Sequence, residues 1–162
     1  MTPYQNMPDY SRVWVYQAGR KLTEAEIISI KEKADLFIEE WTAHGARLKA
    51  CFEIRDGIFL LMLVDEKQAM ASGCSIDKSV HFILDLENEF AVSLTNRLLF
   101  AYRNSAGKVE IVPRNEFEQL VKTGVIKDST PVFNTLVQNK SELETGFEIP
   151  FEKSWQKNLI SA

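Results

Sequence analysis

The sequence predicts an α+β protein, a ferredoxin-like split βαβ two-layer sandwich with an extra strand and a C-terminal helical extension. The first observation is the order of predicted elements, strand–helix–strand–strand–helix–strand, which is the ferredoxin-like order. The second is the continuously apolar segment 58–64, which is typical of a central strand covered on both faces. The third is a length of 162 residues with 45% hydrophobic residues, which suits one globular domain. We therefore expect a single domain over residues 1–162, with a core of about 11–124 and an extension of about 125–162.

The first strand and first helix follow from local patterns. Segment 11–17 is aromatic and β-branched, which favours a strand. Thr23 is expected to open a helix with a capping box, because Glu26 lies three residues further on. Apolar residues then recur at helical spacing as far as Trp41, and Gly45 is expected to supply the left-handed stop.

A hairpin and a second helix come next. Alternation of polar and apolar residues over 47–54 predicts a half-buried strand, and Asp56-Gly57 is a strong turn signal before the apolar strand. Residues 65–75 are expected to form a loop. A helix is predicted over about 76–90, with Val80 on its buried side.

The last third of the chain gives a weaker pattern. Segments 97–102 and 109–112 predict a second hairpin, and a short helix is expected over 116–122. Thr130-Pro131 is typical of a helix start, while a strand over 132–137 is the competing interpretation.

Charge and composition exclude several classes of function. The formal net charge of −4, without a basic run, argues against nucleic-acid binding. The longest apolar run has seven residues, whereas a bilayer span needs roughly 20. The first ten residues do not resemble a secretory signal, and two cysteines, Cys51 and Cys74, are too few for a disulfide framework. We expect a cytoplasmic protein with reduced thiols and no membrane partner.

Chemistry is predicted where the third strand passes into the second helix. The expected topology makes the first and third strands parallel neighbours, so loops 17–22 and 65–75 would lie side by side and both lead into helix starts. A helix start offers unpaired N–H groups and partial positive charge to an anion. The candidate ligand-binding residues are Arg20, Ser72, Gly73, Cys74 and Ser75. The alternative is that Ser75 is merely a helix cap, Gly73 a turn residue and Arg20 a solvated charge.

Cys74 is also a candidate nucleophile, because a helix start favours a thiolate. Covalent catalysis would need a nearby base. His81 is expected to point away, and His44 is expected at the opposite edge of the sheet, so a buried or partly buried thiol is the competing interpretation. Asp77, His81 and Asp85 share one predicted helix face, which more commonly is a solvated stripe than a metal site. We expect no metal and no cofactor.

Four aromatic side chains are the remaining candidates for ligand contact: Trp14, Tyr16, Trp41 and Trp155. A platform for stacking bases would normally accompany a basic groove. In this acidic chain, core or edge packing explains each of them better.

Several segments resemble a family of small uncharacterised bacterial proteins whose members often carry the label "ABC transporter ATPase". The resemblance covers about residues 11–155, and Ser72–Asp77 is its most specific part. It implies no established catalytic residues. The segments that carry it are Val13–Gln17, Trp41–Gly45, Ala71–Asp77 and Phe147–Pro150.

The label itself fails a simple chemical test. An ATPase of this class needs a G-x-x-x-x-G-K-[ST] loop to hold phosphates and magnesium. None of the seven glycines is followed by Lys-Ser or Lys-Thr, and Gly107-Lys108 continues with Val109. We therefore reject ATPase activity.

Two hypotheses of function remain. The first is a non-enzymatic binding or regulatory module that recognises an anionic small molecule or a partner protein near Arg20 and Ser72–Asp77. The alternative is a small enzyme acting on a phosphate- or carboxylate-bearing substrate, with Arg20 as a clamp and Cys74 as nucleophile. An acylphosphatase-like reaction would suit such an edge by analogy of fold only.

Overall fold

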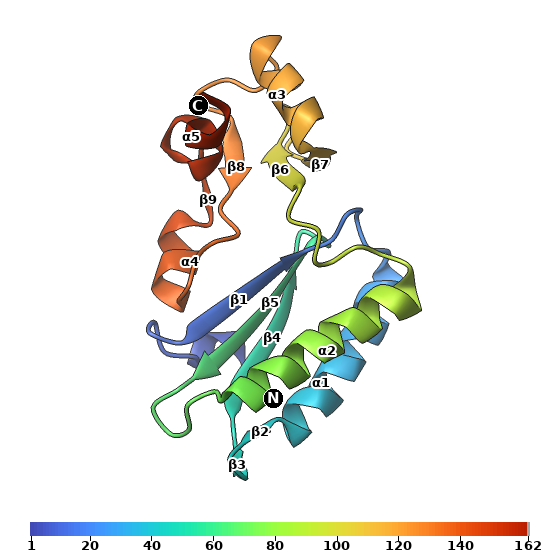
Figure 1. The fold of residues 1–162 in the computed structure, drawn as a ribbon, viewed down its shortest axis with the longest axis vertical. Helices are drawn as coiled ribbons and strands as arrows, with labels where there is room; N and C mark the ends of the chain where they lie inside the picture. Colours follow the sequence, from blue (N-terminus) through green and yellow to red (C-terminus); the bar gives the residue numbers. More distant parts are fainter. Residues whose placement is uncertain (162) are drawn as a thin grey trace.

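The computed structural model describes residues 1–161, and its two larger sheets, of three and four strands, pack against helices, with a two-stranded β2-β3 sheet beside them (Figure 1). The chain is a mixture of helices and antiparallel sheets, as the α+β prediction requires. The first half contains η1 (Tyr4–Asn6), β1 (Arg12–Gln17), α1 (Glu24–Glu40), β2 (Thr42–Ala43), β3 (Ala46–Arg47), β4 (Lys49–Arg55), β5 (Phe59–Asp65) and α2 (Gly73–Phe90). The second half contains β6 (Leu99–Arg103), β7 (Val109–Pro113), α3 (Arg114–Lys122), β8 (Pro131–Phe133), α4 (Lys140–Gly146), β9 (Glu148–Pro150), η2 (Phe151–Lys153) and α5 (Trp155–Ser161).

The first sheet has three strands in the order β1-β5-β4. Every residue of β5 is buried, which confirms the prediction of a central strand covered on both faces. Because successive side chains of a strand point to opposite faces, β5 serves two cores. Leu60, Met62 and Val64 pack with α1 and α2, whereas Phe59, Leu61 and Leu63 pack toward the second sheet.

The predicted capping box of α1 is present, with Thr23 Oγ1 accepting from the Glu26 amide and the Glu26 carboxylate accepting from the Thr23 amide. The helix ends at Glu40, so the prediction that Gly45 stops it is wrong. Gly45 and His44 both have positive φ, at 78° and 50°, and form the tight turn between β2 and β3. Glycine suits that turn because it has no Cβ to clash.

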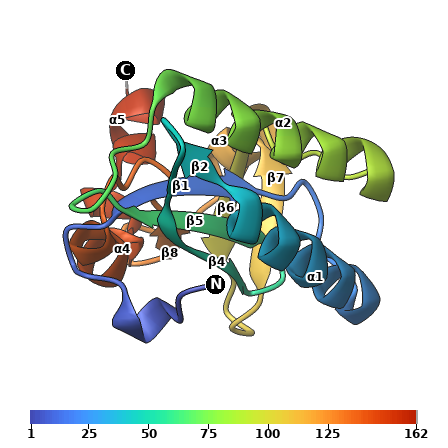
Figure 2. The same cartoon turned by 90° about the horizontal axis from the view of Figure 1, so that it is seen from below.

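The helix α2 begins three residues earlier than predicted, with Ser72 as its N-cap. Its buried residues are Ser75, Ser79, Ile83 and Leu86, while Val80 is 38% exposed, contrary to prediction. Two small serines face inward because α2 lies close to its neighbours, as the hydrogen bond from Trp41 to the backbone of Ser75 shows. Figure 2 shows α1 and α2 together on one side of the first sheet.

The second sheet has the order β7-β6-β8-β9, and its central strand β8 comes from the last quarter of the chain. The predicted hairpin of β6 and β7 is confirmed. The predicted helix start at Thr130-Pro131 is wrong, because Pro131–Phe133 is a strand. Within it, Val132 and Phe133 are buried, so the segment that the sequence suggests as an extension supplies part of the core.

The predicted ferredoxin-like sheet is not confirmed. β1 does lie next to β5, but the two are antiparallel, so the predicted parallel pairing is wrong. The reason is geometric: a helical crossover makes β1 and β4 run the same way, and the tight hairpin then reverses β5. The next strand, β6, joins the second sheet instead of flanking β1.

Hydropathy adds one finding about the helices. Within residues 1–161, none is both long enough and apolar enough to cross a membrane.

Candidate functional site

The predicted anion-binding residues lie in two separate places, because β5 runs antiparallel to β1. Arg20 follows the end of β1, which lies beside the start of β5, whereas Ser72 follows the end of β5. Arg20 donates to the Glu26 carboxylate at 2.9 and 2.8 Å and to the backbone oxygen of Phe90 at 2.9 Å. Arg20 therefore lies at the C-terminal end of α2 and Ser72 at its N-terminal end, about 27 Å apart for an 18-residue helix. The predicted Arg20–Ser72 site is wrong.

Arg20 has a structural role, because it stabilises the ionised form of the Glu26 carboxyl group at the start of α1. Its hydrogen bond, followed by the Thr23 amide, lowers the pKa of Glu26 from 4.5 to about 2. A lowered carboxyl pKa contributes stability above the ordinary pKa, and that stability is lost as the pH falls toward 2.

We predict that R20Q raises the Glu26 pKa toward 4.5, as measured by carbon NMR titration of its carboxyl group. R114Q, which removes the partner of Glu118, is the control and should leave the Glu26 pKa unchanged. If the Glu26 pKa is also unchanged in R20Q, the lowered pKa is due to the helix cap alone.

The two serines of the predicted site are engaged with each other. Ser72 Oγ accepts from the Ser75 amide at 3.1 Å, and Ser75 Oγ accepts from the Ser72 amide at 2.8 Å. Ser75 Oγ also donates to the Ser72 backbone oxygen at 2.9 Å and is fully buried. The hydroxyls close a capping box, so the alternative of a structural helix start describes them, with Ser72 rather than Ser75 as the N-cap. Gly73 and Cys74 follow, both exposed.

Cys74 is exposed, so the interpretation of it as a buried thiol is wrong. The prediction that His44 lies at the opposite edge of the sheet from Cys74 is also wrong. The 2.8 Å hydrogen bond from Trp41 Nε1 to the Ser75 backbone oxygen joins the end of α1, which His44 follows, to the start of α2, where Cys74 lies. Even so, neither His44 nor His81 hydrogen-bonds to Cys74 in residues 1–161. That part of the chain also contains no group of three or more His, Cys, Asp or Glu side chains arranged for a metal ion.

The two cysteines differ enough for a direct labelling prediction. Burial, with the charge of Glu53, raises the pKa of Cys51 to about 12, so its thiol stays neutral and shielded. Iodoacetamide is expected to modify Cys74 in the native protein and to reach Cys51 only after unfolding, as mass spectrometry of the labelled peptides would show. If iodoacetamide alkylates Cys74 no faster than a model thiol between about pH 6 and 9, the hypothesis that Cys74 is a nucleophile is wrong.

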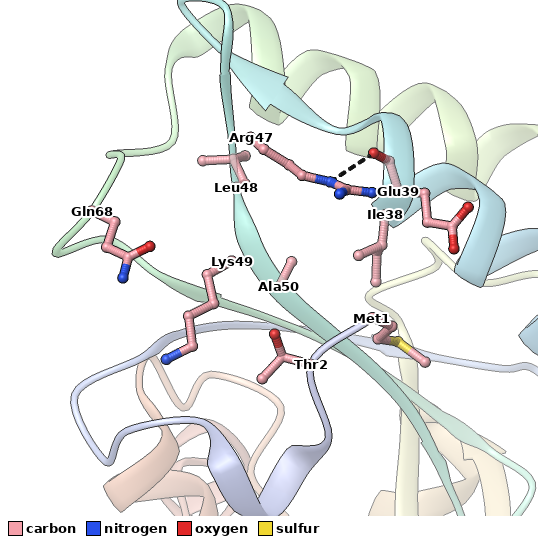
Figure 3. A pocket seen from close by; sticks show the side chains of 9 residues that line it. All are labelled: Met1, Thr2, Ile38, Glu39, Arg47, Leu48, Lys49, Ala50 and Gln68. Carbon is pink, nitrogen blue, oxygen red and sulfur yellow. Dashed lines mark hydrogen bonds between the residues drawn. The ribbon is translucent and has the colours of Figure 1, made fainter.

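One cavity does lie beside the loop that leaves β5, and we call it the Arg47 pocket (Figure 3). It has a volume of about 470 Å³. Its cations are already engaged: Arg47 Nε donates to the Glu39 backbone oxygen at 3.0 Å, and Lys49 Nζ lies 3.1 Å from Asp65 Oδ2. The pocket is lined by Met1, Thr2, Ile38, Glu39, Arg47, Leu48, Lys49, Ala50 and Gln68. Its charges are mixed, because the carboxylates of Glu39 and Asp65 lie beside the cations of Arg47 and Lys49, and an anion bound there would also meet negative charge.

A larger cleft lies where the two sheets and α5 meet, and we call it the Arg97 cleft. Its volume is about 560 Å³, within the usual range for small-molecule sites, roughly 300–1,000 Å³. Its walls come from β1, α2, the linker between α2 and β6, β6 itself, the loop after β8, and α5. The lining residues are Trp14, Val15, Tyr16, Gln17, Val80, Leu94, Thr95, Asn96, Arg97, Leu99, Thr135, Leu136 and Trp155.

Charge distinguishes this cleft from the Arg47 pocket. Among the described residues that line it, Arg97 alone is charged. Within residues 1–161, Arg97 and Arg47 have no salt bridge, whereas Arg12, Arg20, Arg55, Arg103 and Arg114 are paired, and Arg47 donates to a backbone oxygen. Burial raises the pKa of Tyr16, while the Ser79 hydroxyl and the positive charge of Arg97 act in the opposite direction. The Arg97 charge therefore acts on the aromatic wall of the cleft.

The linker that carries Arg97 is fixed by the end of α2. Ala91 ends the helix in the left-handed conformation, with φ of 48°. The Glu87 carboxylate then accepts from the Leu94 amide and from the Thr95 amide and hydroxyl. Burial opposes ionisation of Glu87, but these donors lower its pKa overall. The opposite wall is held by Gln17, whose Nε2 donates to the Leu99 backbone oxygen at 3.1 Å.

In comparisons with known proteins, no family model, curated protein or solved structure matches the chain. The family resemblance stays a prediction. The Arg97 cleft was missed at the sequence level, where Trp14, Tyr16 and Trp155 suggested packing and Arg97 suggested a strand residue. No local signal would have found it, because its walls come from six separate segments.

Proposed function

We propose that this protein is a binding module for a small organic anion, held in the Arg97 cleft. The observation that carries the proposal is the unpaired Arg97 guanidinium in a cleft whose other described lining residues are all uncharged. A guanidinium presents a planar fork that matches a carboxylate or phosphate. The proposal keeps the anionic small molecule predicted from the sequence and moves its site.

The polar groups beside Arg97 support the orientation of such a ligand. Asn96 Oδ1 accepts from the Leu98 amide at 2.9 Å, and the Nδ2 amide group of Asn96 has two N–H bonds with which to donate to a ligand. Thr95 is committed to Glu87 and serves to fix the linker. Apolar residues of β1, α2 and the loop after β8 line the rest, so the anionic end of a ligand would meet the linker and its apolar end would lie deeper in the cleft.

Calorimetric titration with hexanoate and hexan-1-ol tests the proposal, because the two probes share a chain and differ in charge. Hexanoate is expected to bind and hexan-1-ol to bind more weakly. R97Q should weaken hexanoate binding about tenfold or more, the usual cost of losing a hydrogen bond to a charged group.

R47Q is the matched control, since it removes an arginine from the other cavity. Wild-type affinity in R47Q together with the loss in R97Q supports the proposal. If the loss occurs in R47Q and not in R97Q, or if hexanoate does not bind, the proposal is wrong.

A further inference from the structure

The Arg97 cleft has an aromatic character that the proposed function does not use. Trp14 and Tyr16 lie two residues apart on β1 and therefore share one face of the strand. Trp155 comes from α5, at the other end of the chain, and lines the same cleft. All three side chains are only partly buried, although Trp14 and Tyr16 belong to the core against α1 and α2, and Trp155 to the core of the second sheet.

Trp155 has an unsatisfied polar atom. Its indole Nε1 is buried and has no hydrogen-bond partner among the described residues, while its ring packs edge-on against Phe100 at 5.3 Å. Trp41, by contrast, donates to the Ser75 backbone oxygen at 2.8 Å. This Nε1 atom is closed to solvent, so a molecule in the cleft would meet the accessible part of the Trp155 ring and not its N–H group.

The shape and charge of the lining limit the class of ligand. Planar rings gain from offset or edge-on contact with aromatic side chains, beyond the area they bury. A cleft of about 560 Å³ also has room for a ligand with a fused ring system. Trp14 additionally carries the Arg12 guanidinium over its ring, 4.7 Å from the centroid, which helps to hold that indole in place.

We infer that the ligand of the Arg97 cleft is a planar aromatic acid, with its anionic group on Arg97 and its ring against Trp14, Tyr16 and Trp155. The inference rests on the proposed function and names the class of its ligand. It makes Trp155 a binding residue whose ring contacts the ring of the ligand.

The test compares 2-naphthylacetate with its saturated counterpart decahydro-2-naphthylacetate by calorimetry, since both carry the same charge on the same carbon skeleton and only the first is planar and aromatic. The aromatic acid is expected to bind about 2- to 10-fold more tightly, as aromatic contacts imply. W155L should reduce this preference, because Trp14 and Tyr16 remain, while leaving binding that depends on Arg97. Equal or weaker binding of the aromatic acid by the wild-type protein would overturn the inference and leave the proposed function standing, whereas failure of both acids to bind would overturn the proposed function as well.

Nitrogen–proton NMR of the unaltered protein gives a second readout that does not depend on the folding of W155L. Its three indole N–H signals belong to Trp14, Trp41 and Trp155. On titration with 2-naphthylacetate, the Trp155 signal is expected to shift, because an aromatic ring bound against that indole changes its magnetic environment. The Trp41 signal should stay in place because Trp41 does not line the cleft. A Trp155 signal that does not move, or moves no more than that of Trp41, would contradict the inference.

Discussion

Replacing Phe133 by alanine is expected to lower the free energy of unfolding by about 3–5 kcal/mol, the usual cost of removing a fully buried aromatic ring. Phe133 is 1% exposed and lies where the two sheets meet. Its ring centroid is 4.6 Å from that of Phe59 and 5.5 Å from that of Phe147. The cavity left by F133A would fall between two sheets that cannot close without moving against each other.

Urea unfolding followed by circular dichroism measures this effect. L36A is the control: Leu36 is 66% exposed on α1, and its loss should change the free energy of unfolding by less than about 0.5 kcal/mol. A cost for F133A below about 1 kcal/mol would show that the second sheet is not packed on the first as described.

The second large effect is expected at Trp41, which joins the end of α1 to the start of α2. W41A should destabilise the protein by about 3–5 kcal/mol, because the indole is fully buried and packs against Phe37 at 5.2 Å and Trp14 at 6.3 Å. W41F retains a ring but loses the hydrogen bond to Ser75, and should cost about 1–3 kcal/mol.

The same denaturant series measures both Trp41 variants. The order W41A, then W41F, then wild type in rising stability is the expected result. If W41F is as stable as the wild type, the hydrogen bond between the two helix ends contributes nothing measurable, and the start of α2 is held by its capping box alone.

Local signals in the sequence predicted the local structure well. Thr23 with Glu26, Asp56-Gly57 and the apolar strand all act within a few residues, so their patterns survive in any tertiary setting. The polarity of β5 was also available, since a helical crossover followed by a hairpin reverses the third strand relative to the first. Only a β5 parallel to β1 would place Arg20 beside Ser72.

The site could not be predicted in the same way. Whether Thr130-Pro131 continues as a helix or a strand depends on pairing with β6 and β9, far away in sequence. Arg97 and Trp155 come together only after both sheets have formed, and each looks ordinary in its own segment. The serines of Ser72–Asp77 predict an anion site as readily as a helix cap, because both features use the same residue types.

The central claim is that Arg97, and neither Arg20 nor Arg47, meets the anion. NMR of the arginine Nε–Hε signals during titration with hexanoate tests it most directly, because it locates contact in the unaltered protein. The Arg97 signal is expected to shift in proportion to occupancy, while those of Arg20, held by Glu26 and Phe90, and of Arg47, held by Glu39, stay in place. A shift of Arg47 or Arg20 with Arg97 unmoved would contradict the account.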